Sequence, residues 1–304
     1  MSVVEARSER VGELGFDPAA CEREAVNRCN LCGSTHHVEV ARTDRYGFAQ
    51  PFRVCARCGL GFLSPHLTAA EYRRFYENVY RPLVSAYHGR VIDAETVQVE
   101  QAEYARELIE FLRETLPMPP ATVLDVGGST GVVAGAVVQA FGAAATVLDP
   151  APDELAVAAA AGMETIPGFA EDVDLGGRTY DLVLLCQTID HLLDIGATLA
   201  AIRRALGPEG RAFVDVLDVG FMLRRRGSIE GAVKVDHPYY LSRATAHAFF
   251  NQAGLKPVAE RMSHDGHWGF LLEPGTPAEP DWTTLAATSA AFLDDVWQLR
   301  ATGG

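Results

Sequence analysis

The chain has 304 residues, 48% apolar and 22% charged, a balance typical of a soluble globular protein with one core of about 200 residues and a smaller module. A net charge of −14 argues against sequence-independent binding to nucleic acid or anionic membranes, because both depend on dense positive charge. No apolar run approaches the roughly 20 residues that span a bilayer, and the N-terminal segment is too charged for a secretory signal, so we expect a cytoplasmic protein.

Two CxxC pairs follow a polar, Ala/Glu/Arg-rich start that predicts a short helix. The pairs are Cys29/Cys32 and Cys55/Cys58, and a glycine after each pair permits the tight turn that aims backbone amides at the thiolates. In a reducing compartment, this spacing is typical of metal ligands rather than of disulfides. Four thiolates form a closed tetrahedral site suited to Zn²⁺, with no open position for a substrate. The pattern therefore predicts a structural zinc ribbon.

Two alternatives for the cysteines stay open, namely a rubredoxin-like iron site and cysteines without a metal. The segment between the pairs alternates as short strands do, with Gly47 and Pro51 as turn residues. A module of this size builds little core, so we expect the metal to supply its folding energy. The neighbouring His36 and His37 are expected at the surface, and Cys21 and Cys186 are expected to be isolated thiols.

Helical patterns dominate the next 50 residues. Thr68 and Glu71 have the spacing of a capping box before a helix with aromatic residues at helical intervals, and a longer helix is predicted from Asp93 to Leu116, before Pro117. We predict three domains on this basis. They are residues 1–66 with the zinc ribbon, residues 67–116 as a helical linker or lid, and residues 117–304.

From Ala121 onward, apolar strand-like runs alternate with helical stretches. The runs ATVLDV, ATVLD, YDLVLL and RAFVDVL are separated by segments with helical periodicity. This order is typical of β-α-β units and of a parallel sheet buried on both faces. The fold class is therefore predicted to be α/β, with a doubly wound Rossmann-like sheet, the small N-terminal zinc ribbon and the helical lid.

A glycine-rich turn follows the first of these strands in VLDVGGSTGVVAG. Such a turn lets the backbone approach a ligand and aims the amides of the next helix at it. The glycines, Gly127, Gly128 and Gly131, do not match the GxGxxG dinucleotide fingerprint. Asp149 ends the second strand, where a carboxylate can accept both hydroxyls of a ribose.

These motifs together resemble class I S-adenosylmethionine-dependent methyltransferases. The resemblance rests on DVGGSTG, on Asp149, on YDLVLLCQTIDH and on LGPEG, in this order, and covers about residues 117–273. The cysteine pairs ahead of such a domain are similar to those of bacterial enzymes of sugar and secondary-metabolite pathways, including nucleotide-sugar C-methyltransferases. The resemblance thus implies a methyltransferase sheet and S-adenosylmethionine as the cofactor.

The resemblance also implies roles for nine residues. The methionine part of the cofactor would contact Asp125, Gly127, Gly128, Ser129 and Gly131, the ribose Asp149, the adenine Ala170 and Glu171, and the methionine end Gln187. Ser129 stands where the family usually has a second glycine, and Phe169 stands where an aspartate is common.

Methyl transfer to oxygen or carbon requires that the acceptor lose a proton, so a histidine base is sought. His191 follows the fourth strand, at the sheet edge where ligands bind, and His237 lies in VDHPYYLS, in a segment that commonly covers the acceptor pocket. Either histidine can instead be structural. The His264/His267 pair is open to three interpretations, a surface turn, a pocket rim or a second metal site. The Arg224–Arg226 run is either a solvated loop or an anion clamp.

The expected function is methyl transfer from S-adenosylmethionine to an O or C atom of a small hydroxylated, sugar-like or secondary-metabolite acceptor, with Zn²⁺ as a structural ion. The alternatives are another reaction with the same cofactor, a non-catalytic binding or scaffold protein, and a Rossmann-like domain that has lost its ligand. We expect a small-molecule partner and no nucleic acid or membrane partner. The acceptor and the oligomeric state stay open.

Overall fold

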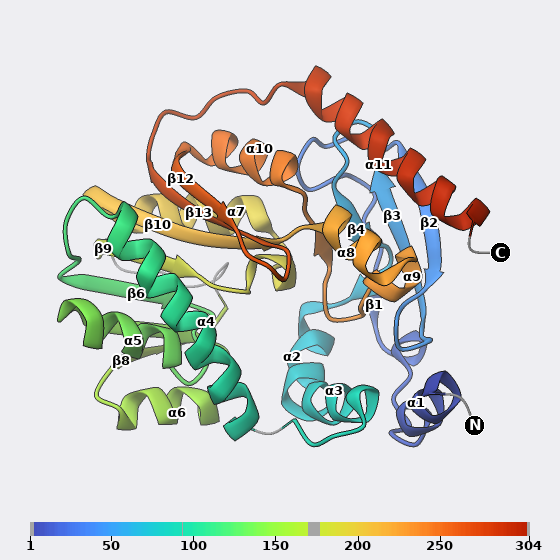
Figure 1. Ribbon diagram of the computed structural model, residues 1–304, viewed down its shortest axis with the longest axis horizontal. Helices are drawn as coiled ribbons and strands as arrows, with labels where there is room; N and C mark the ends of the chain where they lie inside the picture. The colour runs from blue at the N-terminus through green and yellow to red at the C-terminus, as the bar shows by residue number, and fades with distance from the viewer. Residues whose placement is uncertain (1–2, 93, 170–176, 303–304) are drawn as a thin grey trace. The chain divides into compact units, whose positions relative to one another are not determined.

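A computed structural model describes residues 3–92, 94–169 and 177–302 (Figure 1). By their contacts the residues form two compact units, each assembled from separate segments of the chain. The ribbon unit comprises Met1–Ala94, Leu217–Thr245 and Asp281–Gly304, and the sheet unit comprises Glu95–Val216 and Ala246–Pro280.

The sheet unit is built on one largely parallel sheet. Its strands are β6 (Thr122–Val126), β7 (Ala144–Asp149), β8 (Glu164–Pro167), β9 (Tyr180–Leu185), β10 (Leu206–Leu217), β12 (Leu255–Met262) and β13 (His267–Pro274). Their order is β12-β13-β10-β9-β6-β7-β8, in which β8, β7, β6, β9 and β10 pair in parallel and β12 pairs with β13 in antiparallel fashion. The strand order reverses between β6 and β9, which makes the carboxyl edge there the expected place for a ligand.

Helices cover both faces of this sheet. They are α4 (Ala94–Thr115), α5 (Val132–Phe141), α6 (Pro152–Ala160), α7 (Ile195–Ala205) and α10 (Arg243–Ala253). Leu271 of β13 packs into the apolar cluster with α4 and α5, whereas its neighbour Phe270 stacks edge-on against Phe250 of α10. Because successive strand residues face opposite sides, α10 lies on the face opposite α4 and α5 (Figure 1). The predicted doubly wound α/β sheet is thereby confirmed.

The ribbon unit has an antiparallel sheet of its own. Its strands are β2 (His37–Thr43), β3 (Ala49–Cys55), β4 (Gly61–Leu63) and β11 (Tyr239–Tyr240), in the order β11-β4-β3-β2, beside a short pair of β1 (Arg23–Glu24) and β5 (His66–Leu67). Its helices are α1 (Val3–Gly12), α2 (Ala69–Asn78), α3 (Tyr80–His88), α8 (Val219–Arg226), α9 (Ile229–Ala232) and α11 (Trp282–Thr302). The hairpin of β2 and β3 confirms the short strands predicted between the cysteine pairs.

The ribbon sheet has a larger hydrophobic core than its sequence predicts. Phe52 and Val54 of β3 are fully buried, and they join one cluster with Leu223 of α8 and Val296 of α11. Segments more than 150 residues downstream complete this core, and the sequence of the module alone does not predict them. Burial of several such side chains stabilises the unit by about 1.5–3 kcal/mol for each large one.

The two helices predicted within residues 67–116 form as α2 and α4, and the sequence did not predict α3 between them. Thr68 caps α2 by accepting a hydrogen bond from the Glu71 N–H at 3.4 Å. These helices divide between the units, since α2 and α3 belong to the ribbon unit and nearly all of α4 belongs to the sheet unit. The lid role and the three domain boundaries stay predictions. Among the described residues, no helix combines the length and the apolar character that crossing a membrane requires.

Candidate functional site

The turn after β6 is made of glycines that have no room for a side chain. Gly127 has φ +72°, and a Cβ there would lie 2.7 Å from the side chain of Thr188. A Cβ on Gly128 would lie 2.7 Å from the carboxyl carbon of Asp125. The turn is tied to the neighbouring strand by the Gly127 N–H, which donates to the Leu148 carbonyl at 2.7 Å. The backbone therefore folds closely over Asp125.

Ser129 adopts a glycine-like conformation in this turn, with φ +51°. Its N–H donates to Asp149 Oδ2 at 2.9 Å, and its hydroxyl donates to Glu154 in the first turn of α6. A serine is thus accepted where the family usually has a glycine, although the left-handed conformation is costly for a residue with a Cβ. Glu154 was not predicted as a site residue, because no spacing rule connects it to the turn.

Asp125 lies beneath the turn and is 1% exposed. Within the described part of the chain, neither of its carboxylate oxygens has a hydrogen-bond partner of normal geometry, and the Ala134 backbone N–H gives only a weaker stabilisation of the charge. Burial raises the pKa of Asp125 to about 7. A buried polar group of this kind requires an explanation, and a ligand with hydrogen-bond donors is one.

Asp149 closes β7 beside the turn and is 7% exposed. Its two oxygens accept hydrogen bonds from the N–H groups of Ser129 and Ala151, both at 2.9 Å. Burial raises its pKa, and the two backbone donors partly oppose this shift. Each carboxylate oxygen can accept a second hydrogen bond, so the group retains capacity for donors from a ligand.

Gln187 follows β9 and is held by a carboxylate that the sequence did not identify. Its φ is +51°, and its N–H donates to Asp215 Oδ1 of β10 at 2.5 Å. Asp215 is 2% exposed and also accepts the hydroxyl of Tyr104 of α4 at 2.8 Å. His267 Nδ1 lies 3.7 Å from the same carboxylate. Burial raises the pKa of Asp215, against the opposing effect of His267.

The sheet therefore brings most of the predicted cofactor residues to the ends of adjacent strands. Asp125 and the glycine turn follow β6, Asp149 ends β7, and Gln187 follows β9. Ala170 and Glu171 lie outside the described residues, so their predicted contact with adenine stays a prediction.

The two candidate bases lie in different units. His191 is the last residue of a 3-10 turn, Ile189–His191, after β9 in the sheet unit, and its N–H donates to the Thr188 carbonyl at 2.9 Å. His237 belongs to the ribbon unit and is 3% exposed. Its Nε2 lies 3.5 Å from Oδ2 of Asp236, a fully buried residue. The same Oδ2 atom lies 3.4 Å from Lys234 Nζ.

The loop that carries His237 is fixed by side chains from several elements of the ribbon unit. The hydroxyls of Tyr72 and Tyr76 donate to the backbone carbonyls of Val235 and Asp236 at 3.1 and 3.0 Å. Asp44 accepts the Val235 N–H at 3.0 Å. A histidine beside a carboxylate, on a loop held this firmly, has the arrangement of an oriented base as well as that of a structural residue.

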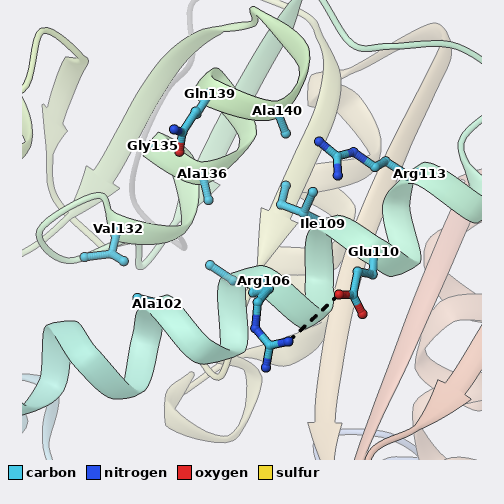
Figure 2. Close-up of a pocket in the computed structure, with 11 residues that line it drawn as sticks. Ala102, Arg106, Ile109, Glu110, Arg113, Val132, Gly135, Ala136, Gln139 and Ala140 are labelled. Carbon is cyan, nitrogen blue, oxygen red and sulfur yellow. Dashed lines mark ion pairs between the residues drawn. The ribbon is translucent and has the colours of Figure 1, made fainter.

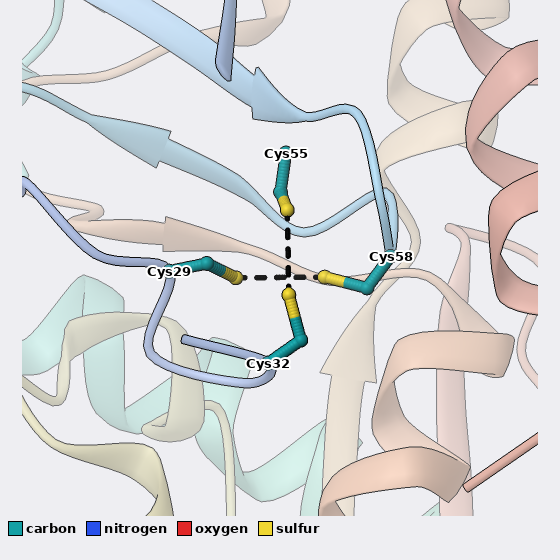
Figure 3. A group of neighbouring side chains, drawn as sticks. All are labelled: Cys29, Cys32, Cys55 and Cys58. Carbon is teal, nitrogen blue, oxygen red and sulfur yellow. Dashed lines mark hydrogen bonds between the residues drawn. The ribbon is translucent and has the colours of Figure 1, made fainter. Parts of the chain in front are cut away.

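The four predicted metal ligands converge in the ribbon unit, and Figure 3 shows their sulfur atoms pointing at one another. All four sulfurs lie within 4.8 Å of one another, with Cys29 to Cys58 and Cys32 to Cys55 at 3.5 Å. Tetrahedral zinc with Zn–S bonds of about 2.3 Å would separate its sulfurs by about 3.8 Å. Hydrogen bonding from Cys29 lowers the pKa of Cys32 to about 7 and lowers that of Cys55 as well. The donor set and its spacing fit a tetrahedral metal ion.

Other groups singled out in the sequence lie outside these sites. His37 Nε2 lies 2.8 Å from the Ser34 carbonyl oxygen, and its ring packs against Phe62. The Nε2 atom is therefore engaged by the backbone and is not a metal ligand in this arrangement. Asp265 and His267 belong to the hairpin between β12 and β13, and no metal-type cluster forms there among the residues that the structure describes. The Arg224–Arg226 run is the last turn of α8 and not a loop.

A groove of about 650 Å³ runs between α4 and α5, as Figure 2 shows. Its walls are mainly small or apolar side chains, with arginines at the rim. The lining residues are Ala102, Ala105, Arg106, Ile109, Glu110, Arg113, Val132, Gly135, Ala136, Gln139 and Ala140. None of the predicted site residues lines it, and Val132, which does, directly follows Gly131 of the turn.

Comparisons with known proteins agree with this geometry. A family model described as a methyltransferase domain matches residues 97–260, just over half of the chain. The C-methyltransferase NovU of Streptomyces niveus is 27% identical over 248 residues, which is 80% of this chain and 54% of that protein. A ubiquinone biosynthesis O-methyltransferase of Xylella fastidiosa is 26% identical over 162 residues, which is 48% of this chain and 65% of that protein. The chain thus spans between half and two thirds of the length of these relatives.

A solved structure shows the same fold. An S-adenosylmethionine-dependent methyltransferase of Leishmania major superposes with a TM-score of 0.51 at 21% identity, over 67% of this chain and 82% of that one. At this identity the likeness concerns the fold alone. Because the family model covers more than half of the chain and includes the glycine turn, Asp149 and the end of β9, this chain belongs to the methyltransferase-domain family, with the class I S-adenosylmethionine-dependent methyltransferase fold.

Proposed function

We propose that this protein transfers a methyl group from S-adenosylmethionine to an oxygen or carbon atom of a small hydroxylated, sugar-like or secondary-metabolite acceptor. The observation that carries the proposal is the buried pair of carboxylates at the switch point of the sheet. Asp125 and Asp149 are 1% and 7% exposed, and the turn beside them has no room for a side chain at Gly127 or Gly128. A buried carboxylate without a hydrogen-bond donor of normal geometry costs stability, so a ligand that supplies donors accounts for Asp125 better than packing does.

The residues present fit that cofactor. The amide groups of the turn and Asp125 would hold its methionine part, Asp149 would accept the ribose hydroxyls, and Gln187 would line the methionine end. Ala170 and Glu171 are proposed at the adenine. The cofactor supplies a methyl group activated by a sulfonium, so alignment and exclusion of water are the main tasks left to the protein.

A base must take the acceptor's proton during transfer to oxygen or carbon. His237 is our first candidate, because its ring nitrogen lies 3.5 Å from the buried Asp236 and its loop is fixed by three side chains of the ribbon unit. His191 is the second, since it follows β9 directly, one strand from the glycine turn.

Replacing the true base with glutamine should lower kcat by about 100-fold or more and leave the affinity for the cofactor unchanged. Replacing the other histidine should leave both kcat and the affinity for the cofactor near their wild-type values. Comparing His237→Gln with His191→Gln in one assay distinguishes the two candidates, and an equal small effect of both would exclude each of them as the base.

The choice between oxygen and carbon as the acceptor atom rests on the relatives. One is named a C-methyltransferase and another an O-methyltransferase. The alignment with the C-methyltransferase extends over 248 residues, well beyond the 164 residues of the family match, so it includes sequence outside the methyltransferase domain. The longer alignment with a C-methyltransferase supports a carbon atom as the acceptor.

We further propose that Cys29, Cys32, Cys55 and Cys58 hold one structural Zn²⁺. The spacing of the sulfurs supports a four-coordinate ion, and four protein ligands leave no position for a substrate. The ion would stabilise the ends of β3 and β4 without taking part in methyl transfer.

Calorimetry with S-adenosylmethionine tests the cofactor site. Asp149→Ala should weaken binding by about 10- to 100-fold while the protein stays folded, because two hydrogen-bond acceptors for the ribose are lost. Asp153→Ala is the matched control, since Asp153 is an exposed carboxylate four residues away. Near-native affinity of Asp149→Ala would refute the site.

Turnover is tested by mass spectrometry on a panel of nucleotide-linked sugars and phenols. A gain of one methyl group on any of them, with formation of S-adenosylhomocysteine, is the expected result. Cofactor binding without a methylated product across hydroxyl and carbon acceptors would favour a binding or scaffold protein.

A further inference from the structure

The described residues contain a buried acidic group that the proposed mechanism does not use. Asp215, near the end of β10, is 2% exposed and lies between three elements of the sheet unit. Tyr104 of α4 donates its hydroxyl to Oδ2 at 2.8 Å, and the Gln187 N–H donates to Oδ1 at 2.5 Å. Burial raises the pKa of Asp215, and His267 and the donors from Gln187 and Tyr104 partly oppose that shift.

Asp215 carries no fixed counter-charge. The titratable groups that act on it are Tyr104, Cys186, Asp190 and His267. Of these, only His267 can become a cation, and its Nδ1 lies 3.7 Å away. Within the described residues, no lysine or arginine pairs with Asp215. A buried negative charge without a permanent partner is expensive, which indicates that it serves a purpose other than packing.

The bond to Gln187 connects this charge to the glycine turn. Gln187 is held at φ +51°, and the next residue, Thr188, touches Gly127 so closely that a Cβ there would lie 2.7 Å from it. Asp215 therefore fixes the segment that borders the turn. In a site of low dielectric constant, a charge acts over several ångströms on other charges.

We propose that Asp215 is a positioning and specificity-determining residue, which holds the segment at Gln187 and uses its negative charge to favour the sulfonium of S-adenosylmethionine over the neutral thioether of S-adenosylhomocysteine. This inference rests on the proposed function and on the proposed cofactor site. Its physical content is a charge preference, since a neutral hydrogen-bond acceptor in the same place would fix the segment but would not distinguish the two ligands.

The test is the ratio of two dissociation constants, measured by calorimetry at pH 8, that of S-adenosylhomocysteine divided by that of S-adenosylmethionine. Asp215→Asn retains an acceptor oxygen for the Gln187 N–H and removes the charge. We expect the ratio to fall about tenfold relative to wild type. Asp181→Asn is the matched control, because Asp181 also accepts backbone N–H groups, of Ala121 and Thr122, but near the start of β9. It should leave the ratio unchanged.

A second pair of variants tests the same idea without altering Asp215. His267→Lys places a permanent ammonium beside the carboxylate and should lower the ratio by a similar factor, whereas His267→Gln should leave it near the wild-type value. The His267 side chain is 19% exposed, so the longer lysine side chain can be accommodated there. This pair remains informative if Asp215→Asn does not fold.

Equal loss of affinity for both ligands would show that Asp215 is structural and would overturn the charge preference. An unchanged ratio in His267→Lys would overturn it as well. If the wild-type protein binds neither ligand, the proposed function itself fails, and that outcome is distinct from binding of both with an unaltered ratio.

Discussion

Gly128 is the position at which a single methyl group should damage the proposed cofactor site. A Cβ there would lie 2.7 Å from Asp125 Cγ and 2.8 Å from its Oδ2, and these atoms belong to a side chain that is 1% exposed. We expect Gly128→Ala to displace Asp125, to weaken binding of S-adenosylmethionine by about tenfold or more and to cost about 1–3 kcal/mol of stability. Calorimetry and thermal unfolding measure the two effects.

Gly135→Ala provides the control for this substitution. Gly135 lies in α5, four residues after the turn ends, and the nearest atom to its added Cβ would be 3.7 Å away. Alanine in a helix is favoured over glycine by about 0.5–1 kcal/mol, so this variant should be neutral or more stable and should bind the cofactor normally. Equal behaviour of the two variants would contradict the steric argument.

Asp125 should make the stability of the unliganded protein fall as pH rises. Its folded-state pKa is about 7, above the value of about 4 expected in the unfolded chain. The folded state therefore keeps a proton that the unfolded state releases, and the resulting stability is full below about pH 4 and is lost as pH rises to about 7.

Asp125→Asn removes this titration. Relative to wild type, the variant should gain on the order of 4 kcal/mol between about pH 4 and pH 7 and keep that advantage above pH 7, while it loses affinity for the cofactor. Urea unfolding at several pH values measures the difference. Parallel curves for the two proteins would show that Asp125 is not the group responsible.

Sequence reasoning found residues next to strand ends and missed residues that only packing brings together. The predicted Asp125, Asp149 and Gln187 end or follow strands that pair in parallel, so their convergence follows from the order of the strands. The contact between Tyr104 and Asp215 joins residues 111 apart in the chain, and neither lies in a recognisable motif. No periodicity encodes such a contact, because it depends on how α4 packs across the sheet.

At the scale of elements, local signals were sufficient for most helices and failed where charge suggested a loop. The spacing of Thr68 and Glu71 predicted the start of α2, and the cap is present. The basic run Arg224–Arg226, for which the sequence predicts a solvated loop or an anion clamp, forms the end of α8 before Gly227 at φ +72°. Basic residues at a helix C-terminus interact favourably with the helix dipole, and this accounts for the position of the run.

The cysteine site should stabilise the ribbon unit without acting in catalysis. Cys55 is fully buried at the end of β3, and its carbonyl accepts the hydroxyl of Ser289 of α11 at 2.9 Å. We expect Cys55→Ser to lower the bound zinc below one equivalent and to lower the Tm, while binding of S-adenosylmethionine persists because its proposed residues lie in the sheet unit. Elemental analysis, thermal unfolding and calorimetry test the three parts.

Cys21→Ser serves as the control for the loss of a thiol, since Cys21 stands apart from the four-cysteine group. It should leave zinc content and Tm unchanged. If Cys55→Ser abolished methyl transfer in a protein that stayed folded and still bound the cofactor, a purely structural role for the cluster would be excluded.

At the scale of the whole molecule, the compact units do not follow the order of the chain. Leu217–Thr245 and Asp281–Gly304 belong with the N-terminal residues, whereas Ala246–Pro280 returns to the sheet. The predicted boundaries at 66/67 and 116/117 follow motif content, which cannot reveal this exchange, because α8 and α11 carry ordinary helical patterns. Their apolar residues, such as Leu223 and Val296, specify burial but not the partner that buries them.

Two units with different ligands should respond separately to those ligands. A ligand that binds only the folded state raises stability by RT ln(1 + [L]/Kd), and the gain belongs to the unit that holds the ligand. We expect a chelator to lower the melting temperature of the ribbon unit, and S-adenosylhomocysteine to raise the melting temperature of the sheet unit by several degrees.

Scanning calorimetry and tryptophan fluorescence together follow both transitions, because Trp282 and Trp297 lie in α11 of the ribbon unit and Trp268 lies in β13 of the sheet unit. Asp149→Ala should abolish the shift caused by S-adenosylhomocysteine and retain the one caused by the chelator, whereas a single transition that responds equally to both reagents would show that the units unfold as one.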